Sequence, residues 1–240
     1  MRITSPVRHA LIIKLADLFF PTLCPVCGKN SDLLNEAPFC SGCWSLITRY
    51  SGPYCRVCSL PLPSEYASVC GTCLKEKPPF ARAMTFGVYE GVLAEAIHQL
   101  KFYGQRRLAQ PLGELLFTLD FPAVDGIVPV PLHSKNLRKR GFNQSLLLAR
   151  ILSRKLALPL FMDILSKTRL TAPQVGLSAK ERVMNIRNAF AVDGHIKNLR
   201  LLLVDDVMTT GATVSECSKQ LRKAGAKEVI VLTLARAGIL

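Results

Sequence analysis

The sequence predicts a small cysteine-rich module followed by an α/β domain with a parallel sheet. From Ala83 onward, short apolar segments alternate with amphipathic ones, which is the pattern of a parallel sheet covered by helices. Before that point, eight of the nine cysteines form four C-x-x-C pairs at nearly constant gaps. Hydrophobic residues make up 49% of the 240 residues, which is ample for a packed core. The charged fraction of only 20% and the absence of low-complexity stretches exclude a mainly disordered chain. No run approaches about 18 uncharged apolar residues, so we expect no transmembrane segment.

Residues 10–20 are predicted to form a short amphipathic helix that ends at Pro21. Lys14 and Asp17 interrupt its apolar run, which argues against a signal peptide. Because no export signal is visible, we expect the protein to be cytoplasmic. Basic residues flank the helix, so a peripheral position at the inner membrane is an alternative to packing against the rest of the protein.

The four C-x-x-C pairs predict two zinc sites. A two-residue gap lets one turn direct two sulfurs at a single ion, and two such turns complete a tetrahedron of thiolates. Zn²⁺ suits this ligand set because it accepts soft sulfur ligands and imposes little geometry of its own. Sequential pairing is the simplest arrangement, and crossed pairing of the turns is an alternative. The expected ligands are Cys24, Cys27, Cys40 and Cys43 for one ion, and Cys55, Cys58, Cys70 and Cys73 for the other.

Three other uses of paired cysteines fit this spacing less well. A disulfide framework would need an oxidising compartment, an iron–sulfur cluster shows more irregular spacing, and a redox dithiol comes singly. A closed Cys₄ site leaves no open position for chemistry, so the zinc is expected to be structural. Cys217 stands alone in a helical pattern and is interpreted as a core thiol. Pro78 and Pro79 would close the module, which gives domains of residues 1–80 and 81–240.

The net charge of +14 is concentrated in one part of the chain. Residues 135–187 contain 12 Lys and Arg against only two acidic residues. Residues 1–80 contain eight basic and five acidic residues. Two Zn(Cys)₄ centres at about −2 each would turn that small surplus into a net charge of about −1. We therefore expect the α/β domain, and not the zinc module, to bind a polyanion, which could be a phosphorylated metabolite, nucleic acid or both.

Apolar periodicity predicts the elements of the α/β domain. In chain order these are a strand over 84–89, helices over 93–100 and 108–116, a strand over 127–130, a helix over 145–156, a strand over 199–204, a helix over 214–224 and a strand over 229–234. Asn143 is a candidate N-cap because its side chain can accept a hydrogen bond from the first turn. Gly225 would end the last helix.

The most informative segment spans residues 201–213. A buried apolar strand ends in Asp205 and Asp206, and a loop rich in Thr and Gly then opens a helix. Loops at the carboxyl ends of parallel strands are where such sheets bind ligands. The backbone N–H groups of residues 210–213 would hold a phosphate with help from the helix dipole. The two carboxylates would accept hydrogen bonds from vicinal ribose hydroxyls or hold Mg²⁺ through water.

Two other interpretations of this segment are weaker. An apolar strand before Asp-Asp also describes a Walker-B strand, but the sequence contains no G-x-x-x-x-G-K-[ST] motif. The acids could simply cap the following turn, which is common for one Asp and much less common for two joined to T-T-G-x-T. A sugar-phosphate site is therefore the favoured interpretation.

Type I phosphoribosyltransferases, which bind 5-phosphoribosyl-1-pyrophosphate (PRPP), carry a signature that resembles the segment LLLVDDVMTTGAT. Together with the double zinc ribbon, this segment makes the chain similar to the ComF/GntX family of competence-associated proteins. Residues 128–133 and 138–145 resemble the pyrophosphate-loop region of that family. The mobile-loop pattern of the family is similar to Arg169, Thr171, Gln174, Leu177, Arg182, Asn185 and Phe190.

The resemblance implies a role for each matching residue. Asp205 and Asp206 would hold the ribose hydroxyls or the metal of Mg²⁺–PRPP. The 5-phosphate would bind to Thr209, Thr210, Gly211, Ala212 and Thr213. The pyrophosphate would face Pro131, Leu132, His133, Lys135, Arg138 and Arg140. A lid over the site would carry Arg169, Lys180 and Arg182.

The resemblance also implies a function. A ComF-family protein is expected to act in DNA uptake during natural competence or in the use of imported DNA as a nutrient. Thr209 stands where 6-oxopurine phosphoribosyltransferases carry a base-contacting Asp, which argues against purine salvage. The chain is either a phosphoribosyltransferase, and thus a glycosyltransferase with an unknown acceptor and unknown catalytic residues, or a non-catalytic adaptor. The adaptor would bind single-stranded DNA or a competence helicase and use PRPP or a nucleotide as a signal.

Few aromatic residues accompany the basic segment, residues 135–187. Phe142, Phe161 and Phe190 are the only candidates for stacking on bases there. We therefore expect any binding of single-stranded DNA to be weak and strongly dependent on salt.

Overall fold

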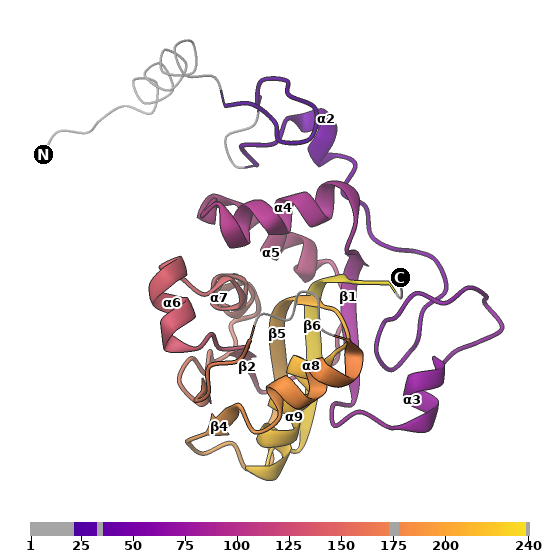
Figure 1. The fold of residues 1–240 in the computed structure, drawn as a ribbon, viewed down its shortest axis with the longest axis vertical. Helices are drawn as coiled ribbons and strands as arrows, with labels where there is room; N and C mark the ends of the chain where they lie inside the picture. The colour runs from indigo at the N-terminus through magenta and orange to yellow at the C-terminus, as the bar shows by residue number, and fades with distance from the viewer. Residues whose placement is uncertain (1–21, 33–35, 173–177, 239–240) are drawn as a thin grey trace, which may run out of the picture. The chain divides into compact units, whose positions relative to one another are not determined.

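The computed structural model describes residues 22–32, 36–172 and 178–238 (Figure 1). The predicted N-terminal helix lies outside the described residues, as do Gln174 and Leu177 of the mobile-loop pattern. The chain divides into two compact units, Met1–Thr48 and Arg49–Leu240. The second unit contains the cysteine pairs from Cys55 to Cys73 together with the α/β domain. No helix in the described part of the chain is long and apolar enough to cross a bilayer.

The central sheet of the second unit is parallel. Among its described residues, four strands are hydrogen-bonded in the order β1-β6-β5-β2. These strands are β1 (Arg82–Val88), β2 (Gly126–Pro129), β5 (Arg200–Met208) and β6 (Glu228–Arg236). Both central strands, β5 and β6, are buried along nearly their whole length, as expected for apolar strands covered on both faces. The α/β class predicted from the sequence is confirmed.

Helices cover this sheet on both faces (Figure 1). On one face lie α4 (Gly91–Phe102), α5 (Ala109–Phe117) and α7 (Gln144–Leu156), with a 3₁₀ turn (Arg106–Leu108) before α5. On the other face, α9 (Ala212–Lys223) packs against β5, β6 and the short helix α8 (Ala179–Ile186). Cys217 of α9 is fully buried in the cluster of apolar residues beneath this helix, as expected for a core thiol.

The strands and helices predicted for the α/β domain are all present. Asn143 is the N-cap of α7, and its Oδ1 accepts a hydrogen bond from the Ser145 N–H at 3.0 Å. β5 is longer than predicted because residues 205–208 continue its pairing with β6. The sequence interpretation missed α6 (Ser134–Arg140), α8, and an antiparallel pair, β3 (Leu165–Lys167) and β4 (Phe190–Val192). These elements are short and largely exposed, so they carry no apolar periodicity.

Candidate functional site

Two buried carboxylates near the carboxyl end of β5 form the centre of the candidate site. Asp205 is 7% exposed and Asp206 is 3% exposed. Asp205 Oδ1 accepts hydrogen bonds from Ser145 Oγ at 2.8 Å and from the Asp206 N–H at 2.9 Å. Asp206 Oδ2 lies 2.7 Å from Lys101 Nζ. Asp205 therefore contacts the start of α7, and Asp206 contacts the end of α4.

The two acids differ in their affinity for a proton. Burial and the neighbouring charge of Asp206 raise the pKa of Asp205 to about 7. Burial acts on Asp206 in the same direction, but the charge of Lys101 overcomes it and lowers the pKa of Asp206. At neutral pH Asp206 is therefore ionised, whereas Asp205 is protonated in part of the molecules and ionised in the rest. A cation or hydrogen-bond donor that arrives at Asp205 would favour its ionised form.

The loop after β5 turns sharply into α9. Gly211 is the N-cap of α9, and its φ of +83° lies in the left-handed region that favours glycine. A Cβ atom added at Gly211 would lie 2.7 Å from Met208 Cε, so a larger residue would not fit without a shift. A cavity of about 30 Å³ lies between this loop and Asp205. Of the residues predicted to bind the 5-phosphate, the cavity is lined by Thr209, Gly211, Ala212 and Thr213, whereas Thr210 is exposed.

Three cationic side chains surround the acids, and only Arg140 was among the predicted residues. The charge of Asp206 raises the pKa of Lys101, although burial acts in the opposite direction. Burial lowers the pKa of Arg140 and that of Lys167, while nearby acids act against this effect. A buried cation with a lowered pKa has too little negative charge around it. An anionic ligand at this position would stabilise all three cations.

The segment after β2 lies beside the acids. The Val130 N–H donates to Val204 O at 2.9 Å, and Asn143 Nδ2 donates to Val130 O at 3.0 Å. These bonds hold the segment next to the strand that carries the two acids. His133 is the N-cap of α6, and its Nδ1 accepts a hydrogen bond from the Lys135 N–H at 3.2 Å. The structure therefore assigns His133 a capping role.

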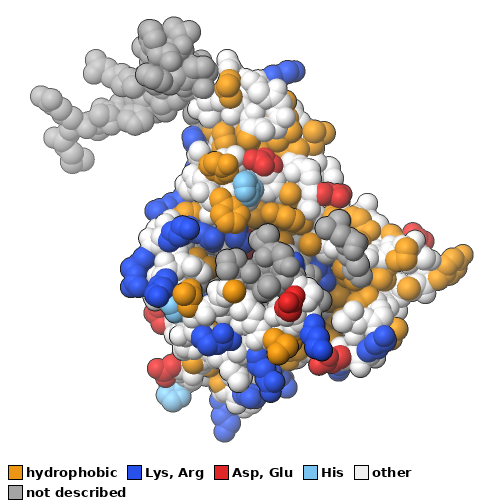
Figure 2. All heavy atoms as spheres, in the orientation of Figure 1, with side chains coloured by type: hydrophobic (Ala, Val, Ile, Leu, Met, Phe, Trp, Pro, Cys, Tyr) orange, Lys and Arg blue, Asp and Glu red, His pale blue; other side chains and the backbone are white. Residues whose placement is uncertain are grey.

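The predicted pyrophosphate residues divide between a short connection and a helix. Pro131, Leu132 and His133 are half-buried in the connection, whereas residues 134–140 form α6. Lys135 and Arg138 are exposed on α6, and Figure 2 shows basic side chains gathered over this part of the molecule. Arg140 at the end of α6 is half-buried. Its Nη1 donates to Gln144 Oε1 at 2.6 Å, and its guanidinium lies 5.5 Å from the centre of the Phe102 ring.

The predicted lid residues lie between β3 and the end of α8. Arg169 Nη2 donates to Asn185 O at 2.8 Å and to Arg187 O at 2.9 Å, so it holds the last turn of α8. Lys180 is exposed on α8 and Arg182 is half-buried there. Lys180 and Arg182 therefore belong to α8, and Arg169 binds the carboxyl end of that helix.

The expected stacking residues do not offer free ring faces. Phe142 and Phe190 are buried, and Phe161 packs against the core. The exposed aromatic side chains near the basic segment are instead Phe102 and Tyr103 at the end of α4, with 60% and 65% exposure. They escaped the sequence interpretation because α4 is distant from the basic segment in the chain and meets it only in the fold.

The eight paired cysteines form two clusters with the sequential pairing. Within each cluster, the four sulfur atoms all lie within 4.8 Å of one another. Cys27 Sγ and Cys40 Sγ are 3.6 Å apart, and Cys58 Sγ and Cys70 Sγ are 3.7 Å apart. Four sulfurs about 2.3 Å from a Zn²⁺ ion would be about 3.8 Å from one another. In each cluster, the last C-x-x-C pair begins at a short helix, α2 (Ser41–Trp44) or α3 (Gly71–Lys75).

Proton affinities within the clusters also fit a bound cation. Although burial opposes it, hydrogen bonds from backbone N–H groups lower the pKa of Cys24 to about 6 and that of Cys55 to about 7. Burial and neighbouring thiols raise the pKa of Cys43 to about 12 and that of Cys73 well above its usual range. Four thiols at this distance do not all ionise without a positive charge among them, and Zn²⁺ supplies that charge.

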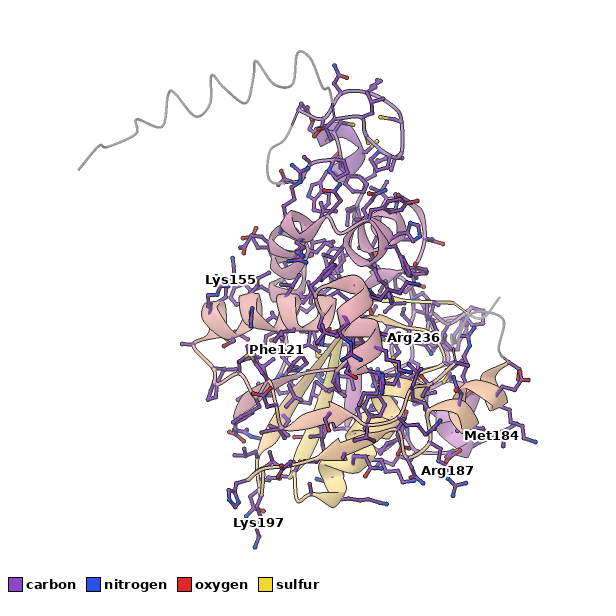
Figure 3. The ribbon with its side chains drawn as sticks, turned by 60° about the vertical axis from the view of Figure 1, so that its left-hand side comes forward. Phe121, Lys155, Met184, Arg187, Lys197 and Arg236 are labelled. Atoms are coloured by element: carbon purple, nitrogen blue, oxygen red, sulfur yellow. The ribbon has the colours of Figure 1, made fainter. Side chains whose placement is uncertain are left out.

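Arg236 joins the second cysteine cluster to the loop after β5, residues 209–211, which is called the phosphate loop below because the 5-phosphate is predicted to bind there. It lies at the carboxyl end of β6 and is 6% exposed (Figure 3). Its Nε donates to Cys58 O at 3.2 Å, and its Nη1 donates to Met208 O at 2.9 Å and to Thr209 O. One guanidinium therefore binds the carbonyl groups of the last residue of β5, of the first loop residue after it, and of one residue of the cluster. Since Cys58 and Arg236 are 178 residues apart, the sequence gives no sign of this contact.

Comparisons with known proteins agree with both halves of this description. The model of the double zinc ribbon domain matches residues 15–74, and the model of the phosphoribosyl transferase domain matches residues 143–239. Competence protein F of Haemophilus influenzae is 37% identical over 230 residues, which cover 91% of this chain and 99% of that protein. The chain belongs to the ComF family. The predicted family is thereby confirmed, as is the fold class of a type I phosphoribosyltransferase-like domain with an N-terminal double zinc ribbon.

Other relatives of this ComF-family protein are named for DNA utilization or for competence. DNA utilization protein YhgH of Escherichia coli is 37% identical over 227 residues, covering 91% of this chain and 99% of that protein. Competence protein ComFC of Bacillus subtilis is 25% identical over 245 residues, covering 95% and 96% of the two chains.

Solved phosphoribosyltransferase structures are more distant. The glutamine PRPP amidotransferase of B. subtilis, solved with ADP and GMP, is 24% identical and has a TM-score of 0.38, covering 52% of this chain and 25% of that chain. The orotate phosphoribosyltransferase of Aeropyrum pernix is 20% identical with a TM-score of 0.35, covering 58% and 63%. The fold is therefore identified by the parallel sheet and the family matches, and not by these structures.

Proposed function

We propose that this ComF-family protein binds PRPP at the carboxyl end of β5 and acts in the uptake of DNA or in the use of imported DNA. The observation that carries the proposal is the junction of the buried Asp205–Asp206 pair with the loop that Gly211 turns into α9. The names Competence protein F and DNA utilization protein, given to relatives that align over nearly their whole length, support the cellular role.

Each group of PRPP has a complementary surface at this site. The ribose hydroxyls would donate to the two carboxylates, and the 5-phosphate would accept hydrogen bonds from backbone N–H groups at the start of α9. The pyrophosphate would face the half-buried cations Lys101, Arg140 and Lys167. The carboxylate oxygens also suit Mg²⁺, which would neutralise part of the pyrophosphate charge when bound. Burial makes these interactions stronger than the same contacts in water.

Phosphoribosyl transfer is the activity that such a site favours. The bond between C1 of the ribose and the pyrophosphate oxygen would break as an acceptor nucleophile bonds to C1. The chain would contribute by holding the ribose in place and by stabilising the leaving pyrophosphate with cationic side chains. The protein would then be a glycosyltransferase.

A second candidate function is that of an adaptor for single-stranded DNA. The exposed basic residues of α6 and the exposed rings of Phe102 and Tyr103 lie on adjoining elements, since Arg140 contacts the Phe102 ring. Cationic side chains that follow a phosphate backbone, with aromatic rings between them, are typical of surfaces for single strands. The same surface could receive a competence helicase. In this function PRPP would act as a signal.

Calorimetry with Mg²⁺–PRPP tests the binding site. Replacing Asp205 and Asp206 with Asn removes charge-assisted hydrogen bonds worth ~1.5–3 kcal/mol each. We expect affinity for PRPP to fall by about 100-fold or more, while the fold survives. Asp163→Asn, at an exposed acid outside the site, is the matched control and should change nothing. Unchanged affinity in the double variant would disprove this location for PRPP.

The salt dependence of DNA binding separates the two candidate functions. A single strand that follows the basic residues of α6 would show a log–log slope of about −0.7 for each phosphate contact. We expect such binding to weaken with salt and to compete with Mg²⁺–PRPP. Binding that is tight, insensitive to salt and indifferent to PRPP would show that DNA uses another surface.

We also propose that the protein carries two structural Zn²⁺ ions and acts in the cytoplasm, with the inner membrane as a peripheral location. The geometry of both Cys₄ clusters and the double zinc ribbon match support the metal. The reducing cytoplasm would keep the thiolates available for it. Elemental analysis of protein purified without added metal should find two zinc ions per chain. Finding iron, or no metal, would contradict this.

A further inference from the structure

A pocket of about 300 Å³ lies outside the site described above, between the second cysteine cluster and strand β1. β1 is an edge strand, and the chain before and within the cluster covers its open side. The Tyr50 N–H donates to Phe86 O at 3.0 Å, and the Ala83 N–H donates to Val57 O at 2.7 Å. The pocket belongs entirely to the second compact unit. Its volume lies at the lower end of the range of small-molecule sites.

The lining of this pocket is strongly basic. Its charged residues are Arg49, Arg56, Arg82, Arg236 and Asp120. Within the described part of the chain, none of the four arginines forms an ion pair with a carboxylate. A Zn(Cys)₄ centre would add about −2 on the side of the cysteine cluster. Even with that charge and the single carboxylate, the pocket keeps an excess of positive charge.

Two of these guanidinium groups keep N–H groups that could bind a ligand in the pocket. Arg82 Nε is buried and lacks a hydrogen-bond partner in the described structure, and Arg82 Nη2 makes only a long contact of 3.5 Å with Asp120 O. Arg236 uses Nε and Nη1 to bind carbonyl groups, while its Nη2 makes no hydrogen bond with the described residues. Native proteins pair nearly all buried N–H groups. Arg82 Nε is therefore short of an acceptor.

Two tyrosine rings form another part of the lining. Tyr54 is 49% exposed, and Tyr50 is half-buried with its hydroxyl donating to Pro53 O at 3.2 Å. Guanidinium groups are the preferred partners of phosphate oxygens because they can donate two parallel hydrogen bonds. Aromatic rings are the preferred partners of nucleobases because every base has a face for stacking.

We propose that this pocket is a second phosphate site that binds a nucleoside 5′-phosphate unit. The phosphate would accept hydrogen bonds from Arg82 and Arg236, and the base would lie against Tyr54. The unit could come from a free mononucleotide or from the 5′ end of a DNA strand, which present the same chemistry. Because Arg236 also holds the carbonyl groups of Met208 and Thr209, a ligand here would contact the same guanidinium that supports the phosphate loop.

Titration calorimetry on the full zinc-loaded chain can detect this site directly. The probes are deoxyadenosine 5′-monophosphate, deoxyadenosine without phosphate, and a 5′-phosphorylated oligothymidylate. Arg82→Gln removes the unpaired buried donor, and Tyr54→Ala removes the exposed ring. Arg236 is left unchanged because its loss would also disturb the phosphate loop. Arg154→Gln, at an exposed arginine of α7 outside the pocket, is the matched control.

We expect the phosphorylated probes to bind and the unphosphorylated nucleoside to bind at least 10-fold more weakly. Arg82→Gln and Tyr54→Ala should each weaken binding at least 10-fold, and Arg154→Gln should leave it unchanged. Equal affinity for mononucleotide and oligonucleotide would identify a free nucleotide as the ligand, whereas preference for the oligonucleotide would identify a strand end. Should Arg82→Gln fail to fold, as judged by circular dichroism, Arg49→Gln on the exposed rim replaces it.

The same experiment tests whether the mononucleotide binds at the proposed PRPP site instead. The Asp205→Asn/Asp206→Asn variant should bind the mononucleotide as the unmodified chain does, even if it has lost PRPP. Loss of mononucleotide binding in that variant, with full binding in Arg82→Gln, would overturn the second site. Absence of binding by every phosphorylated probe would overturn it as well. Neither result depends on whether PRPP itself binds.

Discussion

The two cysteine clusters have the same ligands and spacing but different surroundings. The first lies in the compact unit of residues 1–48, and the second lies in the larger unit with the parallel sheet. Cys55, Cys58 and Cys70 belong to the same buried apolar cluster as Leu203 of β5. Through Cys58 O, the second cluster also contacts Arg236, which holds the phosphate loop.

This difference shows that one motif can serve two structural purposes. Metal binding provides the folding energy of a short segment that has little apolar core of its own. Where the segment also packs against a sheet, loss of the metal removes support from that sheet and from the loops at its end. The two clusters should therefore respond very differently to the same substitution.

Removal of one zinc site at a time should give the largest effect. Structural zinc contributes ~10–16 kcal/mol in isolated zinc-binding peptides, and a whole domain has a net stability of only ~5–15 kcal/mol. We expect Cys58→Ser/Cys70→Ser to unfold much of the second unit or to lower its melting temperature strongly. Cys27→Ser/Cys40→Ser should leave the main transition almost unchanged. Calorimetric melting together with zinc content measures both.

Each of these double variants is the control for the other, because both should retain one zinc ion of two. Equal loss of stability in the two variants would mean that the second cluster does not support the sheet. Loss of both metals in either variant would mean that the sites do not fold independently.

Substitution of Arg236 should weaken ligand binding with a smaller loss of stability. Arg236→Gln removes a charged donor from the carbonyl groups of Met208 and Thr209, and hydrogen bonds from charged groups are worth ~1.5–3 kcal/mol each. We expect affinity for Mg²⁺–PRPP to fall by about 10- to 100-fold, as measured by calorimetry. Arg236→Lys should restore part of it.

Arg222 offers a matched control at the opposite end of α9. Its Nη1 also donates to two carbonyl groups, those of Ala226 and Lys227. Arg222→Gln should lower stability to a similar degree and leave PRPP affinity unchanged. If both substitutions weaken PRPP binding equally, Arg236 acts through general stability and does not position the loop.

The smallest expected effect is a change in the pH dependence of stability. The pKa of Asp205 is raised to about 7 in the folded protein, against about 4 in an unfolded chain. Between these values the folded state binds the proton more tightly, so this group lowers stability as the pH rises from about 4 to 7. Asp205→Asn should remove this pH-dependent contribution.

Melting curves of Asp205→Asn and the unmodified chain without Mg²⁺ measure this contribution. The melting temperature of the variant, relative to that of the unmodified chain, should increase from pH 5 to pH 7. The same increase should appear when both chains also carry Cys27→Ser/Cys40→Ser, because the first cluster belongs to the other unit. A constant difference across this range would show that Asp205 does not titrate there.

Sequence reasoning was most successful where the chemistry is local. Residues 201–213 form a strand, two acids, a turn and a helix without interruption, so the pattern and its spacing could be recognised directly. The cysteine pairs are equally local, and their sequential pairing is the one that the structure contains. The N-cap at Asn143 was predicted correctly for the same reason, because its partners are two and three residues away.

Sequence reasoning failed for partners that come from distant elements. Lys101, which pairs with Asp206, lies at the end of a helix that gave only an apolar stripe. Lys167 lies on a three-residue strand without any pattern. Arg236 stands at the end of the last strand, where the sequence alone suggests an exposed residue, yet the structure buries it. The predicted stacking residues Phe142 and Phe190 are core residues, because exposure depends on packing and not on residue type.

The sequence by itself determined the metal ligands, the parallel α/β class and the acid–loop–helix segment, because each depends on spacings of a few residues that local geometry fixes. Only the tertiary structure decided which cations surround Asp205 and Asp206, and that the second cysteine cluster contacts the phosphate loop through Arg236. The physical reason is that burial and electrostatic partners arise where segments far apart in the chain pack together. A charge surplus in the sequence predicts an anionic ligand, but only the fold brings Lys101, Arg140 and Lys167 to the same pair of carboxylates.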